Sequence, residues 1–292
     1  MKQNPLSFQS KLKPEDFLPA TEEEKQSQII MRESVGFWKD GMRRLSKNKV
    51  AMVSLVIIIF VMFISFIVPM FYPYNYKEQF KGANHLAPME YSAEEQARID
   101  AGEKVFPHIF GTDKMGRDYA IRVMMGSRIS LIVGLVATAI ILVIGSIYGS
   151  VAAFFGGWVD LVMMRIVDII STIPLTLYVI LIMVLLGQGI QSIIIALGTV
   201  YWVDMARVVR GQVLSLKEQE FVLAAKTIGS STKTILFEHL IPNAMGSILV
   251  TVTMLIPSAI FMEAFLSYLG IGLKPPLASL GTMCNEATEN LR

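Results

Sequence analysis

Few residues of this chain have the types and spacing that catalysis would need. Its three histidines, His85, His108 and His239, are far apart, and the zinc-binding pattern His-Glu-x-x-His does not occur. The nucleophile elbow Gly-x-Ser-x-Gly and the phosphate-binding loop Gly-x-x-x-x-Gly-Lys-[Ser/Thr] are also missing. The one cysteine, Cys284, excludes an internal disulfide and a zinc site built from cysteines. We therefore predict no catalytic residues, no metal site and no cofactor bound by this chain.

The charged residues with suggestive spacing stand instead at the ends of long apolar runs. Arg165 and Asp168 are three residues apart, and Asp204 and Arg207 repeat that spacing with the order of charge reversed. On a helix this spacing puts both groups on one face, so each pair is predicted to form a local salt link, with a gating role as the alternative. Only Glu263 comes near the middle of a run. Ion-coupled carriers usually place ionisable residues in mid-span, which makes that class the weaker alternative.

The composition points to a membrane protein. Charged residues make up 17% of the 292 residues, with 26 Lys and Arg against 24 Asp and Glu, whereas a soluble domain carries about 25%. Apolar residues reach 53%, and the mean hydropathy is +0.53. These values exclude a disordered chain, a nucleic-acid binder and a disulfide scaffold.

Five apolar segments are long enough to cross a bilayer, whose core of about 30 Å needs about 20 helical residues. The charge-free run 169–203 is too long for one span, and Gly187 and Gly189 divide it into a hairpin of two, the first kinked at Pro174. The fold class is therefore an all-α integral membrane protein, a polytopic helical bundle. The predicted spans lie in residues 50–70, 129–159, 165–186, 190–210 and 240–273.

Small residues and glycine pairs mark close packing and turns inside these segments. Gly145 and Gly149 are four residues apart in the second run, which lets helices approach closely in lipid. The Phe-Phe-Gly-Gly stretch at 154–157 predicts a tight turn.

The distribution of Lys and Arg predicts the orientation. Ten of them precede the first span, whereas residues 71–127 hold seven against eight acidic residues, so the N-terminus is predicted to be cytoplasmic. Phe37, Trp38, Met42 and Leu45 recur at helical spacing among basic residues, which predicts an interfacial amphipathic helix. The predicted parts are a cytoplasmic tail (1–33), the interfacial helix plus first span (34–70), an external loop (71–127), a core (128–273) with a cytoplasmic loop (211–241), and an external C-terminal segment (274–292).

The cytoplasmic loop is predicted to contain two helices, 214–228 and 231–240, with a turn at Gly229 between them. Ser230 and Ser231 suit the start of the second helix, and Pro242 with Asn243 is predicted to end it.

The first of these helices has features of a docking surface. Ala224 and Ala225 leave room for another backbone to approach, and Phe221, Val222 and Ile228 supply apolar anchors. Two interpretations remain open, which are docking into a groove on a partner and a plain helical hairpin packed on its own bundle.

The loop resembles the EAA loop of ABC-importer permeases, which has Glu-Ala-Ala, three residues, Gly, nine residues and Ile-x-Leu-Pro. Here Leu223-Ala224-Ala225, Gly229 and His239-Leu240-Ile241-Pro242 keep that spacing, with Leu and His replacing Glu and Ile. By this resemblance, the residues that contact an ATPase are Glu220, Phe221, Ala224, Ala225, Gly229 and Pro242.

The resemblance extends to other segments. Residues 110–118 (Phe-Gly-Thr-Asp-Lys-Met-Gly-Arg-Asp), followed by Arg122, look like the external signature of peptide-importer permeases. The segments 164–168 and 263–272 and the basic N-terminal helix are similar to the C-type subunit of the dipeptide and oligopeptide (peptide/nickel) type. The signature residues are Gly111, Thr112, Asp113, Gly116, Arg117 and Asp118. Thr112 and Asp113 are predicted to cap a short external helix, with contact to a binding protein as the alternative.

The resemblance implies the partners and the setting. A second, homologous permease completes the pore, two cytoplasmic ATP-binding subunits carry ATP and Mg, and an extracellular or periplasmic protein delivers peptide. Residue Glu263 then faces the translocation path or pairs with the second permease. The chain would lie in a bacterial inner membrane, and the alternative cargoes are a nickel chelate, an opine or a sugar. The family has a sixth span, and no apolar run long enough to cross a membrane follows Leu273.

Overall fold

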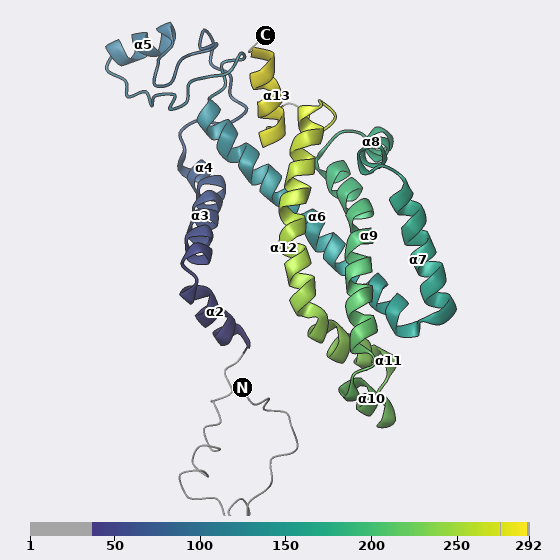
Figure 1. Ribbon diagram of the computed structural model, residues 1–292. Coiled ribbons are helices and arrows are strands. Elements are labelled where there is room, and N and C mark those ends of the chain that lie inside the picture. The colour runs from purple at the N-terminus through teal and green to yellow at the C-terminus, as the bar shows by residue number, and fades with distance from the viewer. Residues whose placement is uncertain (1–36, 275, 291–292) are drawn as a thin grey trace, which may run out of the picture. The chain divides into compact units, whose positions relative to one another are not determined.

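The computed structural model describes residues 37–274 and 276–290 (Figure 1). The predicted tail 1–33 and the first three residues of the predicted interfacial helix lie outside the described residues. Apart from one isolated antiparallel bridge between Thr112 and Asp118, the regular structure of the described residues is helical. The prediction of an all-α fold is confirmed.

The chain divides into two compact units, residues 1–58 and 59–292. The described part of the first unit contains α2 (Phe37–Lys47) and the first part of α3 (Lys49–Phe66). Exposed basic side chains, including Arg43 and Lys47, lie on α2 together with the exposed Met42. The predicted helix is therefore present over Phe37–Lys47, and its position at a membrane interface stays a prediction.

Four stretches are long and apolar enough to span a membrane, and a fifth arises if one bent pair counts as a span. The four are α3 with α4 (Val68–Phe71), α6 (Tyr119–Phe155), α9 (Ile190–Leu216), and the run 232–268 that ends in α12 (Ile241–Tyr268). The bent pair is α7 (Gly157–Thr172) and α8 (Leu175–Leu186), which meet at 86°. Pro174 stands at this bend, so the predicted kink is a full break in the helix.

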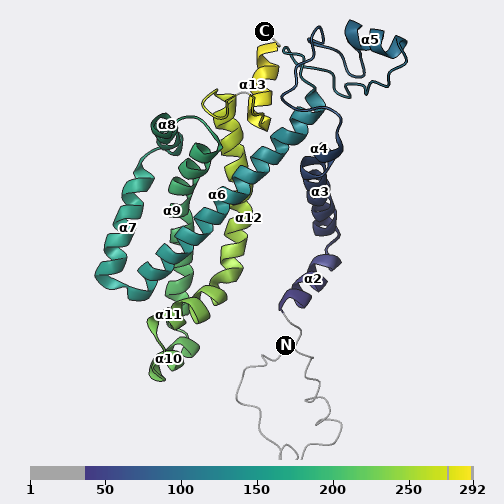
Figure 2. The ribbon, with the colours of Figure 1, turned by 180° about the vertical axis from the view of Figure 1, so that it is seen from behind.

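Helix α6 crosses α9 and α12 diagonally and holds the bundle together (Figures 1 and 2). Where α6 meets α9, a Cβ added to Gly149 would stand 3.0 Å from the backbone nitrogen of Arg210. A Cβ added to Gly145 would stand 2.9 Å from the carbonyl oxygen of Trp202. Only glycine allows this approach. The predicted close packing is confirmed, as is the turn between α6 and α7, where Gly156 and Gly157 both have positive φ.

The predicted end of a helix at Pro242 and Asn243 is wrong. A short α11 (Thr232–Thr234) continues as a π-helix (Ile235–Leu240) and then as α12 without a turn. Pro242 is the second residue of α12, directly after the π-helix, and the chain stays helical through it.

Two helices of the structure, α5 (Ala93–Asp100) and α13 (Leu280–Asn290), were not predicted from the sequence. Helix α5 lies in the predicted loop 71–127, and α6 begins at Tyr119, inside that same predicted loop. Helix α13 lies in the predicted segment 274–292 and packs on α12 and α6. A Cβ on Gly281 would stand 2.6 Å from the Ala264 Cα, so α13 rests directly on the α12 backbone.

Candidate functional site

The 110–118 segment is a tight turn built around two glycines. Gly111 and Gly116 have φ of 73° and 72°, and a Cβ on either would press on backbone atoms of residues 80, 86 and 87. Between them, Asp113 Oδ1 accepts hydrogen bonds from the backbone N–H of Met115 at 2.7 Å and of Arg117 at 3.0 Å. The spacing of the glycines and the aspartate is therefore explained by the geometry of the turn.

Thr112 and Asp113 do not cap a helix, so that prediction is wrong. Thr112 Oγ1 donates to the Ala83 carbonyl and accepts from Leu86 N–H at 2.9 Å, which ties the turn to the preceding segment. The helix cap is Asp118, whose carboxylate accepts from Ile121 N–H at 2.9 Å at the start of α6.

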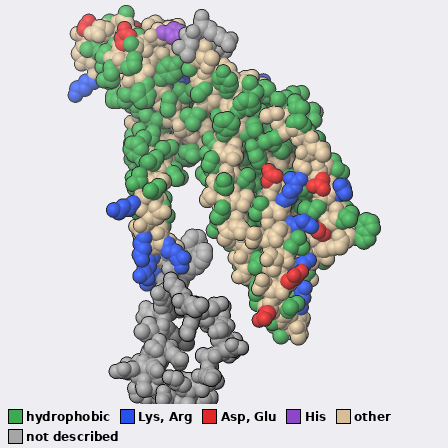
Figure 3. Space-filling view, in the orientation of Figure 1, with side chains coloured by type: hydrophobic (Ala, Val, Ile, Leu, Met, Phe, Trp, Pro, Cys, Tyr) green, Lys and Arg blue, Asp and Glu red, His purple; other side chains and the backbone are tan. Residues whose placement is uncertain are grey.

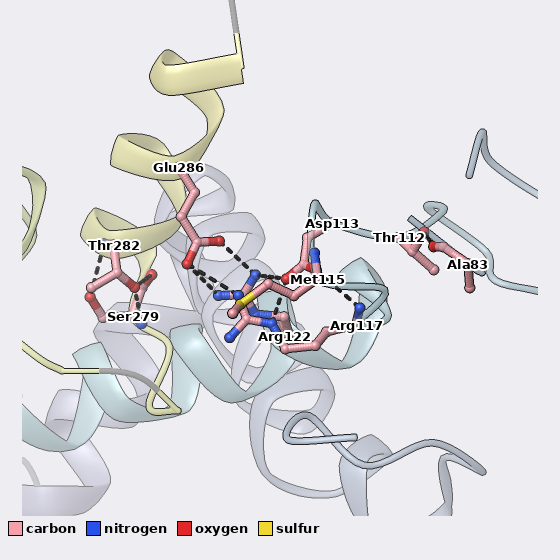
Figure 4. Close-up of polar contacts among 9 residues, drawn as sticks. All are labelled: Ala83, Thr112, Asp113, Met115, Arg117, Arg122, Ser279, Thr282 and Glu286. Atoms are coloured by element: carbon pink, nitrogen blue, oxygen red, sulfur yellow. Dashed lines mark hydrogen bonds and ion pairs between the residues drawn. The ribbon is translucent and has the colours of Figure 1, made fainter. Parts of the chain in front are cut away.

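Two arginines and two carboxylates form a buried ionic cluster beside this turn (Figure 4). Asp113 Oδ2 accepts from Arg117 Nε at 2.6 Å and also from Arg122 Nη1. Arg122 in turn donates to both oxygens of Glu286 on α13, at 2.6 and 2.8 Å. The Asp113, Arg117 and Arg122 side chains are at most 3% exposed and that of Glu286 is 17% exposed. Such a cluster is tolerable because each charge has an opposite partner, and it joins the turn to α6 and α13.

The six predicted signature residues are themselves buried, whereas Phe110, Lys114 and Met115 are exposed. The signature residues therefore hold the turn in shape from inside the protein and are not themselves its contact surface. All six lie in the turn, and the last of them, Asp118, is also the N-cap of α6.

A second buried polar group lies next to the turn. His108 Nδ1 is 2.8 Å from Asp118 Oδ2, and His108 Nε2 is 3.0 Å from Glu95 Oε1. The imidazole is fully buried and stacks on Tyr74, with ring centroids 4.6 Å apart. Glu95 also accepts from Ser92 N–H and Oγ, completing the capping box at the start of α5. This group fixes α5 to the start of α6.

The 211–241 loop has a different helix arrangement from the predicted one. Helix α9 continues to Leu216, and α10 (Glu220–Thr227) follows after a short break, in place of one helix over 214–228. Gly229 turns the chain with φ of 82°, as predicted, and Ser231 caps α11 by accepting from Thr234 N–H at 3.1 Å.

The predicted docking residues of this loop divide into an inner and an outer set. Ala225 is 4% exposed and belongs to the apolar core that includes Val222 and Ile235. Glu220, Phe221 and Ala224 are exposed, as are Gly229 and the first turn of α12 at Pro242. The apolar side chains on the outer surface are Phe221, Leu223, Ile228 and Phe237, with exposed fractions of 39%, 51%, 82% and 49%.

The charged side chains of α7 and α9 form ion pairs mainly between these two helices, and less within each helix. Arg207 on α9 contacts Asp168 on α7 at 3.4 Å and Asp204 on its own helix at 3.5 Å. The predicted link between Arg165 and Asp168 is not formed, since no ion pair of Arg165 occurs among residues 37–274 and 276–290. A stronger pair that sequence analysis missed is Arg210 with Asp160, joined by two hydrogen bonds of 2.5 and 2.6 Å.

Glu263 lies inside its own chain. The residue is fully buried, accepting from Ser130 Oγ of α6 at 2.6 Å and from Ser267 Oγ of α12 at 2.8 Å. Neither expected role, in a translocation path or in pairing with another subunit, agrees with this position. Glu263 instead joins α12 to α6 within the bundle.

These features define a multi-pass helical membrane protein whose polar groups organise turns and helix contacts. The chain belongs to the family described as "Binding-protein-dependent transport system inner membrane component", which matches residues 143–289. Residues 36–88 match "N-terminal TM domain of oligopeptide transport permease C". The chain is therefore a permease component of a transport system.

Named relatives cover most of the chain. It is 46% identical over 270 residues to the oligopeptide transport system permease protein OppC of Bacillus subtilis, covering 92% of this chain and 83% of the relative. The dipeptide transport system permease protein DppC of the same organism is 43% identical, covering 92% and 79%. OppC of Escherichia coli is 38% identical, covering 91% and 83%. A solved structure, "Crystal structure of an amino acid ABC transporter with histidines", aligns with a TM-score of 0.40 at 17% identity, covering 56% of this chain and 76% of that one, which adds nothing to the assignment.

Proposed function

We propose that this chain is one of two permease subunits that together form the pore of an ATP-binding-cassette importer for peptides. The observation that carries the proposal is the 46% identity, over 92% of this chain, to a protein named as an oligopeptide permease. The chain itself is a non-catalytic transport subunit, and ATP and Mg bind to partner subunits. A separate binding protein delivers the peptide from outside a bacterial inner membrane.

The loop around α10 is the docking site for an ATP-binding subunit. Its support is the exposed apolar surface of Phe221, Leu223 and Ile228, which lies beyond the long apolar part of α9. Exposed apolar residues at a polar end of a membrane protein favour a protein contact. Helix α10 is anchored to the bundle through Val222 and Ala225, so a force on the outer surface reaches α9 and α12.

The orientation follows from the same loop. If α10 faces the cytoplasm and α9, the α7–α8 pair, α6 and α3 each cross the membrane once, alternation of the spans makes the segment before α3 cytoplasmic, as the positive-inside rule also predicts. The buried cluster of Asp113, Arg117, Arg122 and Glu286 then lies on the outer side, under the surface that receives the binding protein.

Uptake measured in a strain that lacks its own peptide permeases tests the proposal. Cells that express this chain with the second permease, the ATP-binding subunits and the binding protein should accumulate labelled trialanine. A complex with inactive ATP-binding subunits serves as the control and should show no accumulation. If the assembled complex took up a nickel chelate, an opine or a sugar and no peptide, the peptide assignment would be wrong.

A further inference from the structure

A stripe of exposed polar side chains runs between α7 and α9. This hairpin stripe consists of Arg165, Asp168 and Ser171 on α7 and Asp204 and Arg207 on α9, and all five residues are exposed. Figure 3 shows red and blue side chains gathered over these two helices, next to apolar surface. The sequence predicted these charges at a span boundary. Along α7 and α9 they lie away from the end of the bundle where α7 begins and α9 ends.

The hairpin stripe lies well inside the hairpin. Asp168 is eleven residues after the start of α7 at Gly157, and Asp204 is twelve residues before the end of α9 at Leu216. At 1.5 Å per residue each carboxylate is about 16 to 18 Å along its helix from the shared end. That is about half of a bilayer core of about 30 Å.

Charged side chains at this depth do not face lipid, because exposure to hydrocarbon costs each of them several kcal/mol. They face either a water-filled path or another protein. A cavity of about 350 Å³ lies beside the stripe, lined by Ser171, Pro174, Tyr201, Asp204 and Arg207. Its volume is within the range of small-ligand sites.

The break between α7 and α8 favours a water-filled path, rather than a contact with another protein, beside the hairpin stripe. Broken helices at membrane depth occur where the backbone is buried in protein or lines a cavity, and transporters often use them at substrate sites. Pro174 both breaks the helix and lines this cavity. A flat contact with another subunit would leave the hollow unfilled, whereas protein interfaces pack as densely as protein interiors at their centre.

Of the two carboxylates in the hairpin stripe, Asp204 is the one that lines the cavity and is the more exposed, at 67% against 54% for Asp168. Arg207 is held at 2.6 Å by Ser171 Oγ and shared between Asp168 and Asp204 at 3.4 and 3.5 Å. The Asp204 side chain is 67% exposed, and this one long contact is its only ion pair in the described part of the chain. A carboxylate accepts about four hydrogen bonds, so most of its capacity is free.

Every unmodified peptide carries an α-ammonium group, whatever its sequence. On the basis of the proposed function, we propose that Asp204 binds the α-ammonium group of a peptide crossing the membrane, while Arg207 is fixed by Asp168 and Ser171. Recognition of a group common to all peptides suits a path that tolerates many side chains. Asp204 is thereby a substrate-binding residue in a non-catalytic subunit.

The test compares trialanine with N-acetyl-trialanine in proteoliposomes that contain the complete complex. The wild-type complex should prefer the free-amino peptide, and Asp204→Asn should remove that preference by raising KM for trialanine about tenfold or more, the range for a lost hydrogen bond to a charged group. Asp204→Glu, which keeps the charge, should restore most of it. Glu94→Gln, which removes an exposed acidic group from α5, is the matched control and should behave as wild type.

Three results would overturn the assignment. They are a wild-type complex without preference, an Asp204→Asn complex that loses both peptides equally, and an Asp204→Asn chain that no longer co-purifies with the second permease, which would place Asp204 at the subunit interface. Failure of the wild-type complex to transport either peptide would instead contradict the peptide-importer proposal itself.

Discussion

His108 Nδ1 lies 2.8 Å from Asp118 Oδ2, and both side chains are fully buried. The other ring nitrogen faces Glu95 at 3.0 Å, so two acceptors surround one imidazole. A neutral imidazole has only one N–H, and both contacts are satisfied only by the doubly protonated ring. Burial opposes that charge, but the hydrogen bonds and negative charges of Asp118 and Glu95 outweigh it and raise the pKa of His108. Burial also raises the pKa of the neighbouring Tyr74 to about 12, so this phenol stays neutral.

The segment 72–118 is predicted to lose stability as the pH rises. A raised folded pKa gives stability that is fully present below the unfolded value of about 6.5 and is lost as the pH passes the folded pKa. Limited proteolysis of this segment in the intact complex should therefore accelerate between pH 6 and pH 9. His108→Gln should remove the pH dependence, while His85→Asn, which changes an exposed histidine of the same segment, should keep it. Equal proteolysis across this range in the wild-type protein would contradict the prediction.

Removal of the Glu286 carboxylate should destabilise the protein strongly. Glu286→Ala leaves Arg122 with Asp113 as its remaining carboxylate partner, and loss of a partner in a buried ion pair costs about 3–5 kcal/mol. A clear fall in the thermal unfolding midpoint of the purified complex is expected. The matched control is Glu103→Ala, whose partner Arg98 is exposed, and it should cost at most about 1 kcal/mol. Similar effects for both variants would show that the buried cluster contributes little.

At Gly229 the backbone conformation, not space, is predicted to limit substitution. Its φ is 82°, and a Cβ added there would meet no neighbouring atom of the described residues within 4 Å. Gly229→Val should therefore strain the turn and reduce co-purification of the ATP-binding subunits, whereas Gly229→Asn, which tolerates this conformation, should retain them. Gly211→Ala, in the helical part of α9 with equal space, is the control and should be neutral. Loss of the subunits in the Asn variant as well would point to a requirement beyond conformation.

Adjacent alanines of the loop should respond differently to the same substitution. Ala224→Trp places an indole on the exposed side of α10 and should block docking of an ATP-binding subunit, with normal amounts of this chain in the membrane. Ala225→Trp overpacks a core site and should destabilise the chain itself. Membrane levels and co-purification, measured side by side, separate the two effects. If Ala224→Trp kept full co-purification, the docking surface would lie elsewhere.

Opposite ends of the bundle are predicted to label from opposite sides of the membrane. Cysteines introduced at Glu94 and Lys233, both exposed, should react with a membrane-impermeant maleimide from outside and inside respectively. The native Cys284 is exposed and must first be replaced by serine. Labelling of both positions from the same side would contradict the proposed orientation.

Sequence patterns located the membrane-crossing segments because charges and glycine pairs interrupt long apolar runs. The break at Pro174 and the turn at Gly229 were predictable for a similar reason, since proline and glycine restrict or permit particular backbone angles. The Ser92–Glu95 capping box is also visible in the sequence, although α5, which it begins, was not predicted.

Other features depend on contacts that local patterns do not encode. Arg122 follows the segment that resembles the external signature of peptide-importer permeases. Nothing near it in the sequence predicted its pairing with Glu286, 164 residues away. The ion pair of Arg207 with Asp168, formed in addition to the one with Asp204 on its own helix, depends on how α7 packs against α9. Likewise, the burial of Ala225 beside an exposed Ala224 was set by the direction in which α10 faces the bundle.

The Arg122–Glu286 bridge also has a consequence for the order in which the protein is made. Arg117 and Arg122 leave the ribosome long before Glu286, and until α12 has inserted the two guanidinium groups share Asp113 alone. The 110–118 turn is then one carboxylate short of charge balance. Its final shape is reached only after α13 has arrived beside it, so a correctly formed turn reports that the helices made between them are in place.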